Sequence, residues 1–186
     1  MAVADHLNVN LRHKLSEDDV FITSGASQAI ELMLTVLARP GANILLLRPL
    51  FPLYKERASL VGLEVRSFDL LPDRDWEVDL DGVESLADDK TIAMVIINPG
   101  YPTGNVFTLD HIHKIGETAR RKGIIVIADE VYRHIVFGIQ KFTPIGMYSA
   151  CAYYRINVEK MAYTWLAPWL DCGFRFQWCP YSIGDH

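Results

Sequence analysis

The sequence is poor in cysteine, has no excess of basic residues and contains no long apolar run, and each absence argues against a class of protein. Three cysteines among 186 residues, all in the last fifth of the chain, support neither a disulfide framework nor a zinc site, so we expect no bound metal. A net charge of −5 argues against a nucleic-acid partner. No apolar run reaches membrane-spanning length and the first residues do not resemble a signal peptide, so we expect a cytoplasmic protein without a membrane partner.

Two signatures of nucleotide-binding proteins are also missing. Neither GxGxxG nor GxxxxGK[ST] follows the first predicted strand, which argues against a nucleotide-binding α/β domain. The composition is that of an ordinary globular protein, with 50% hydrophobic and 22% charged residues. The length suits a single domain with a real core.

The most informative stretch covers residues 91–132, where two apolar, β-branched runs flank a helical pattern. The runs over residues 93–97 and 124–128 are typical of buried parallel strands, and residues 109–121 have helical periodicity. This order predicts one strand–helix–strand unit.

Polar residues follow both of these strands. Asn98 and Tyr101 follow the first strand, and Asp129 and Tyr132 follow the second. Ligands of open parallel sheets bind beyond the carboxyl ends of the strands, so we expect both groups to face one crevice. A poorly solvated carboxylate at Asp129 needs a cationic partner. Two interpretations stay open for it, an ion pair with a protonated ring nitrogen of a cofactor or the N-cap of a following helix.

The rest of the first 150 residues alternates predicted strands with predicted helices. This alternation indicates an α/β fold with a mostly parallel sheet and flanking helices. We expect strands over residues 18–23, 42–48 and 60–70, and helices over residues 2–15, between the turn at residues 24–27 and Pro40, and over residues 80–87.

Two further places offer contacts to a ligand. Small residues between the first strand and its helix leave backbone N–H groups open, which makes a cradle for a phosphate. The alternative is that Ser24 and Ser27 only cap the helix. Phe51 and Tyr54 follow the strand over residues 42–48, where an aromatic ring either stacks on a planar ligand or packs in the core.

Five segments together resemble the fold-type I pyridoxal-phosphate aminotransferases, most closely the tyrosine and nicotianamine aminotransferase group. They are FITSGASQAIE (21–31), LARPGANILLLRPLFPLY (37–54), FDLLPDRDWEVDLDGVESLAD (68–88), VIINPGYPTGNV (95–106) and IIVIADEVYRHIVFG (124–138). They follow the family's order over about residues 2–149. The resemblance implies that residues 1–150 are an incomplete large domain of the pyridoxal-phosphate-dependent transferase fold.

The resemblance also implies a function and a site. The function is transfer of an amino group from an aromatic or related amino acid to a 2-oxo acid, by a homodimer that uses pyridoxal 5'-phosphate. The implied contacts are Gly25, Ala26 and Ser27 for the phosphate, Phe51 for the pyridine ring, Asp129 for its protonated nitrogen and Tyr132 for the phenolic oxygen.

One position departs from the family within these segments. The family has asparagine immediately before PTG, where it donates a hydrogen bond to the phenolic oxygen, and this chain has Tyr101. A tyrosine still donates a hydrogen bond, but its side chain is much larger. We therefore expect weaker or displaced cofactor binding.

Residues 151–186 form a tail that does not follow the family pattern, and whether it is folded, disordered or misfolded stays open. The family's catalytic lysine, which forms a Schiff base with the cofactor, lies in a motif like SKRWxxPGWRxGW that is absent here. Lys160, the only lysine of the tail, is the one available stand-in. The alternative function is therefore a truncated, catalytically inactive chain that at most binds pyridoxal phosphate or an intact subunit.

Back-translation suggests a hypothesis for this tail. Codons for residues 158–171 can be chosen so that a shift of one base reads SKRWLIPGWRLGW. Met161 followed by Ala162 forces a tryptophan in the shifted frame, and Trp165 and Trp169, each followed by leucine, force two glycines. One base gained near the codon of Ala150 therefore accounts for the tail as a shifted-frame translation of an aminotransferase gene.

Overall fold

The computed structural model describes residue 8 and residues 16–139, 141–147, 153–159 and 161–166, the last two ranges by their backbone alone. The strands are β1 (Val20–Thr23), β2 (Asn43–Arg48), β3 (Glu64–Leu71), β4 (Glu77–Val78), β5 (Thr91–Ile97), β6 (Ile125–Asp129), β7 (Tyr153–Glu159) and β8 (Met161–Leu166). The α-helices are α2 (Ala26–Leu37), α3 (Leu53–Leu60), α4 (Leu80–Leu86) and α5 (Leu109–Lys122). Short 3-10 helices are η1 (Glu17–Asp19), η2 (Pro72–Arg74) and η3 (Ile145–Met147). The helix predicted over residues 2–15 lies outside the described residues.

The strands form one sheet in the order β1-β8-β7-β6-β5-β2-β3-β4. Neighbouring strands from β7 to β3 pair in parallel, whereas β8 is antiparallel to both β7 and β1. It follows that β1 runs in the same direction as β7, β6, β5 and β2. The predicted α/β class with a mostly parallel sheet is confirmed.

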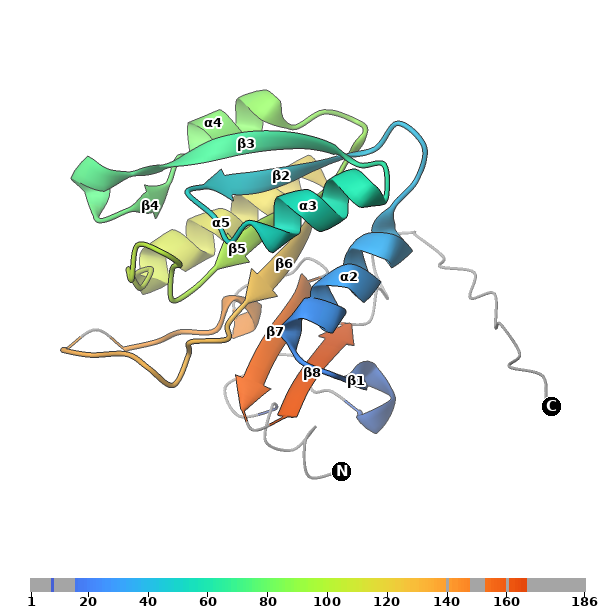
Figure 1. Cartoon of the computed structure of the whole chain (residues 1–186). Coiled ribbons are helices and arrows are strands. Elements are labelled where there is room, and N and C mark those ends of the chain that lie inside the picture. The colour runs from blue at the N-terminus through green and yellow to red at the C-terminus, as the bar shows by residue number, and fades with distance from the viewer. Residues whose placement is uncertain (1–7, 9–15, 140, 148–152, 160, 167–186) are drawn as a thin grey trace.

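Chain direction decides which face of the sheet each helix covers. From β2 to β3 the chain moves towards one edge of the sheet, and from β5 to β6 it moves towards the other. Because parallel crossovers are right-handed, the helices of these two connections lie on opposite faces. Figure 1 shows α2 and α3 on one face and α4 and α5 on the other.

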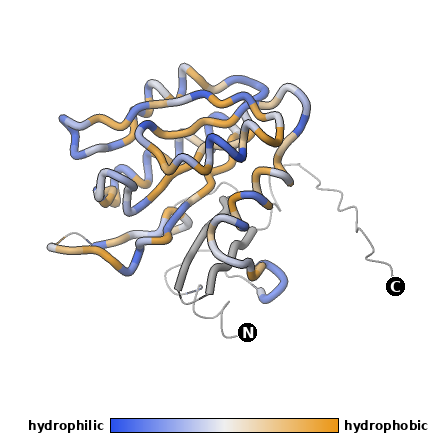
Figure 2. Tube along the Cα trace, viewed as in Figure 1, coloured by the Kyte–Doolittle hydropathy of each residue, from blue (hydrophilic) through white to orange (hydrophobic). Residues whose placement is uncertain are grey.

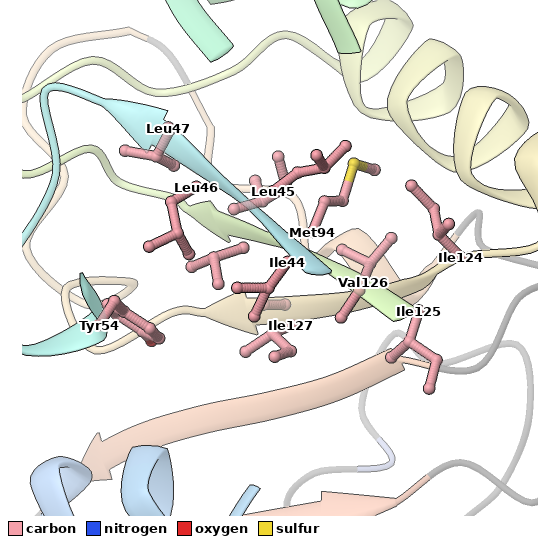
Figure 3. Packing of buried hydrophobic residues seen from close by; sticks show 14 of the residues in the cluster. Ile44, Leu45, Leu46, Leu47, Tyr54, Met94, Ile124, Ile125, Val126 and Ile127 are labelled. Carbon is pink, nitrogen blue, oxygen red and sulfur yellow. The ribbon is translucent and has the colours of Figure 1, made fainter. Parts of the chain in front are cut away.

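The core lies along the three central strands, which are covered on both faces. All residues of β5 and β6 are buried, and in β2 only the last residue is exposed. Figure 2 shows these strands as the most hydrophobic part of the trace, and Figure 3 shows their aliphatic side chains packed together. Each such side chain contributes about 1.5–3 kcal/mol when it is fully buried. The central sheet is therefore a rigid support for residues at its edge.

Capping residues define where α4 and α5 begin and where α5 ends. Thr108 accepts a hydrogen bond from the backbone N–H of His111 and begins α5, and Gly123, at a φ of 66°, ends it. Asp79 accepts from the backbone N–H of Gly82 and begins α4. Among the described residues, no helix combines the length and the apolar character needed to cross a lipid bilayer.

Several parts of the fold differ from the prediction. The predicted strand over residues 60–70 begins only at Glu64, because α3 ends at Leu60 and a turn follows. The first strand is shorter than predicted, since η1 includes Asp18 and Asp19. Strands β7 and β8 lie in the tail, where the sequence showed no period that predicts them.

Candidate functional site

The fold itself marks one point on the edge of the sheet. β2 and β5 are neighbours, and the connections that follow them leave in opposite directions. The carboxyl ends of two such strands open a crevice in which doubly wound proteins bind ligands. The residues that follow β2, β5 and β6 are therefore the first candidates for a site.

Asp129 ends β6 at this edge and is buried, with only 6% of its surface exposed. Its Oδ2 accepts a hydrogen bond of 3.0 Å from the hydroxyl of Tyr54, and its Oδ1 accepts one of 3.2 Å from the backbone N–H of Val131. Burial raises the pKa of this carboxyl group to about 6, against the effect of both hydrogen bonds. No lysine or arginine within the described ranges forms an ion pair with it.

The hydrogen bond from Val131 also decides between the two interpretations of Asp129. It joins Asp129 to the residue two positions later, where backbone hydrogen bonds form turns over residues 131–134 and no helix follows. The N-cap alternative is therefore wrong, because Asp129 caps a turn and not a helix. The ion pair with a cofactor stays a prediction.

Tyr54 is the residue of this site whose role the sequence did not reveal. It lies in the first turn of α3, is fully buried, and has a pKa raised by burial and by the nearby Asp129 carboxylate. Ala58, four residues later, is also fully buried, so the two form the inner face of a helix that the prediction missed. Two inward-facing residues four positions apart, directly after a proline, are a sequence signal that could have predicted this helix.

Phe51, Tyr101 and Tyr132 come together in one row at the same edge. The rings of Phe51 and Tyr101 meet edge to face with centroids 5.7 Å apart, and those of Tyr101 and Tyr132 are stacked at 6.4 Å. Their exposed fractions are 37%, 41% and 39%. The alternative that Phe51 packs in the core is therefore wrong. The prediction assigned Phe51, Tyr101 and Tyr132 to one ligand, and the structure places their rings side by side.

The predicted phosphate cradle lies at the beginning of α2. Gly25 is the N-cap, at a φ of 86° that favours glycine, and no side chain caps the helix. The alternative that Ser24 and Ser27 cap α2 is therefore wrong. Ala26 and Ser27 open the helix, so their backbone N–H groups have no partner within it. Because β1 is parallel to β6, this end of α2 lies on the same edge of the sheet as Asp129.

Asn98 stabilises the loop that contains Tyr101. It is fully buried, its Oδ1 accepts a hydrogen bond of 3.1 Å from the backbone N–H of Phe107, and its Nδ2 is 3.5 Å from the carbonyl oxygen of Thr143. The polar residue after β5 therefore closes a loop, while Tyr101 remains at the surface. Lys160, the predicted stand-in for the catalytic lysine, lies outside the described residues.

A cavity of about 440 Å³ opens beside this loop. Asp75 and Trp76 hold left-handed backbone conformations at its wall, and Asn105 donates a hydrogen bond to the carbonyl oxygen of Trp76. None of the cofactor contacts implied by the resemblance lines it, so it lies next to the candidate site and not within it. Its lining residues are Asp75, Trp76, Glu77, Thr103, Gly104, Asn105, Val106, Phe107, Thr108 and Phe137.

Known proteins resemble this chain over most of its length. Nicotianamine aminotransferase 1 of Oryza sativa subsp. japonica is 48% identical over 177 residues, which cover 95% of this chain and 35% of that protein. S-alkyl-thiohydroximate lyase SUR1 of Arabidopsis thaliana is 54% identical over 149 residues, which cover 80% of this chain and 32% of that protein. The chain spans about a third of the length of these curated relatives.

The crystal structure of tyrosine aminotransferase from Leishmania infantum superposes with a TM-score of 0.83 at 31% sequence identity, and covers 88% of this chain and 48% of that one. A family model described as aminotransferase class I and II matches residues 1–167. The match continues past Ala150, and the domain boundary placed there stays a prediction. The predicted resemblance to tyrosine and nicotianamine aminotransferases is confirmed, and the chain belongs to the aminotransferase class I and II family.

Proposed function

We propose that this chain forms the cofactor-binding part of a pyridoxal-phosphate-dependent aminotransferase that moves an amino group from an aromatic or related amino acid to a 2-oxo acid. The observation that carries the proposal is Asp129, a buried carboxyl group at the end of β6, beside the switch point between β5 and β2, with no cationic partner among the described residues. Burying a carboxylate without a cation is costly. A protonated pyridine nitrogen supplies the missing charge.

The other residues of the edge fit the same cofactor. The open N–H groups at the beginning of α2 suit a phosphate, and both Gly25 and Ala26 leave room for it because they carry little or no side chain. Phe51 offers a ring for stacking, and the hydroxyl group of Tyr132 is a donor for the phenolic oxygen. When bound, pyridoxal phosphate supplies an electron sink that stabilises a carbanion next to the amino group. Asp129 keeps the ring nitrogen protonated, which that chemistry requires.

A catalytic lysine decides whether the chain turns over substrate or only binds the cofactor. Transamination by the family's route needs an amine that binds the cofactor covalently and moves a proton. In this chain Lys160 is the available residue of the tail, and the motif around the family's lysine is absent. This absence favours a second candidate function, a chain that binds pyridoxal phosphate without turnover. We also propose that the chain forms a homodimer, as the resemblance implies, and that it lies in the cytoplasm, as expected from a sequence without a signal-peptide pattern or a membrane-spanning run.

The experiment measures cofactor binding and turnover separately with the purified chain. Pyridoxal phosphate is titrated by calorimetry into the wild type, Asp129→Asn and the control Asp89→Asn, which alters an exposed carboxylate. We expect Asp129→Asn alone to weaken binding. Equal, measurable affinity of the wild type and Asp129→Asn, or no binding by any variant of the chain, overturns the proposal.

Turnover is then assayed with tyrosine and a 2-oxo acid, and a lysine-bound cofactor is fixed by borohydride reduction and located by peptide mass spectrometry. Formation of the 2-oxo acid of tyrosine together with label on a lysine supports the aminotransferase. Binding that depends on Asp129, with no label and no product, supports the chain that binds without turnover.

A further inference from the structure

The three rings of the row follow the order of the strands beneath them. Phe51 follows β2, Tyr101 follows β5 and Tyr132 follows β6, and β5 lies between the other two strands. Tyr101 contacts both neighbours: its ring is perpendicular to that of Phe51, with centroids 5.7 Å apart, and stacked with that of Tyr132 at 6.4 Å. The ring of Tyr101 therefore fills the space between Phe51 and Tyr132.

That space is also where the proposed function puts the cofactor ring. A pyridine ring that stacks on Phe51, and whose phenolic oxygen accepts a hydrogen bond from Tyr132, has to lie between these two side chains. We propose that Tyr101 plugs the site of the cofactor ring. The side chain of Tyr101 must leave the space between Phe51 and Tyr132 before pyridoxal phosphate binds there. This inference rests on the proposed function.

The surroundings of Tyr101 allow such a movement. Its side chain is partly exposed, so it can turn towards solvent without crossing the core. In the described part of the chain, its hydroxyl group has no hydrogen bond to a protein atom, and the two ring contacts hold it. Two aromatic contacts of ordinary strength correspond to about fivefold to a hundredfold in a binding equilibrium.

The buried pair of Tyr54 and Asp129 need not move when the row of rings opens. The hydrogen bond from Tyr54 to Asp129 spans the same three strands, from the helix after β2 to the end of β6. Both side chains are buried, whereas the three rings above are partly exposed. The contact for the pyridine nitrogen is therefore ready in the free chain, and only the exposed row has to open.

Two substitutions separate the plug from the opposite role, in which Tyr101 helps by donating a hydrogen bond to the cofactor. Tyr101→Phe keeps the ring and removes the donor, and Tyr101→Asn removes the ring and keeps a donor. If Tyr101 is a plug, Tyr101→Asn binds pyridoxal phosphate at least about fivefold more tightly than the wild type. Tyr101→Phe then stays within about twofold, since a factor of two is below half a kcal/mol.

The dissociation constants are measured by calorimetry on the full chain, with Phe137→Asn as the control because Phe137 is 85% exposed and outside the row. Equal or weaker binding by Tyr101→Asn overturns the plug, and so does a clear loss of affinity in Tyr101→Phe. Asp129→Asn in the Tyr101→Asn background tests the proposed function separately. If it does not weaken binding, the proposed cofactor site fails whatever the Tyr101 variants do. No binding by any variant overturns both.

A second measurement follows the side chain itself. Tyrosine nitration with tetranitromethane is quantified at Tyr101 by peptide mass spectrometry, with and without saturating pyridoxal phosphate. The plug predicts faster nitration of Tyr101 in the presence of the cofactor, because its ring has turned towards solvent. Protection of Tyr101 by the cofactor overturns the proposal.

Discussion

The hydroxyl group of Tyr54 donates a hydrogen bond of 3.0 Å to Oδ2 of Asp129, and both side chains are buried. Tyr54 comes from the helix that follows β2, and Asp129 ends β6, so the bond spans the end of β5 between them. It fixes the orientation of the carboxyl group at the point where the sheet opens. Tyr54 is therefore a positioning residue, and its removal has consequences that can be measured.

Tyr54→Phe should raise the pKa of Asp129 above its present value of about 6. The hydrogen bond from Tyr54 favours the ionised carboxylate, and without it only the bond from Val131 opposes the effect of burial. We also expect the free energy of unfolding at pH 7 to fall by about 1–3 kcal/mol, because a buried acceptor loses its donor. The carboxyl resonance of Asp129, followed by NMR through a pH titration, gives the pKa directly. Tyr132→Phe is the control, and an unchanged pKa in Tyr54→Phe contradicts the positioning role.

The pH dependence of stability should reveal Asp129 in the wild type. Its pKa is raised from 3.8 in the unfolded chain to about 6 in the folded one, so the folded state holds the proton more tightly. The stabilisation is complete below pH 4 and is lost as the pH rises through 6, by about 3 kcal/mol in total. Denaturant unfolding from pH 4 to pH 7 measures this loss.

Asp129→Asn removes the titrating group and isolates that contribution. Subtracting the stability profile of Asp129→Asn from that of the wild type cancels the other carboxylates, among them Asp88, whose pKa is lowered by the Arg66 side chain. The difference should therefore fall as the pH rises from 4 to 7. A flat difference means that Asp129 is not buried as described. Asp89→Asn, at an exposed carboxylate, should reproduce the wild-type profile.

Gly25→Ala should damage the beginning of α2 in two ways. Gly25 has a φ of 86° and a ψ of 167°, a region that is essentially limited to glycine, so an L-residue there costs about 1–3 kcal/mol. The change also shifts the open N–H groups of Ala26 and Ser27, so it should weaken the binding of pyridoxal phosphate. Gly41→Ala is a matched control, because Gly41 has a φ of 75° but lies in the turn before β2. Both variants should lose stability in denaturant unfolding, because both glycines have a positive φ. If both also bind the cofactor equally, the beginning of α2 does not hold the phosphate.

The central part of this fold was predictable because its signals are local. The apolar runs of β5 and β6 and the helical pattern between them appear in the structure within two residues of their predicted ends. The position of Asp129 at a strand end followed from the same pattern. By contrast, only Tyr54 and Ala58 among the eight residues of α3 are buried, and three charged residues lie between them, so periodicity did not reveal the helix.

The contacts within the site could not be predicted from the sequence alone. The bond between Tyr54 and Asp129 joins residues 75 positions apart and depends on the order of strands in the sheet. The ring of Tyr101 lies between Phe51 and Tyr132 because β5 lies between β2 and β6. Strand order is decided by packing over the whole domain. The sequence predicted which residues meet at the edge, and packing decides which of them touch.

Sequencing the encoding DNA and transcript across the codons from Met147 to His186 tests the frame hypothesis for the tail. We expect codons for residues 158–171 that read SKRWLIPGWRLGW after a shift of one base, with one base gained near the codon of Ala150. In that case the lysine of the family motif is encoded in the other frame, across the codons of Glu159 and Lys160. A chain translated from the corrected frame should then bind pyridoxal phosphate covalently, as the borohydride assay detects. Codons that cannot yield the motif contradict the hypothesis, and Lys160→Ala in the present chain then becomes the direct test of the tail's own lysine.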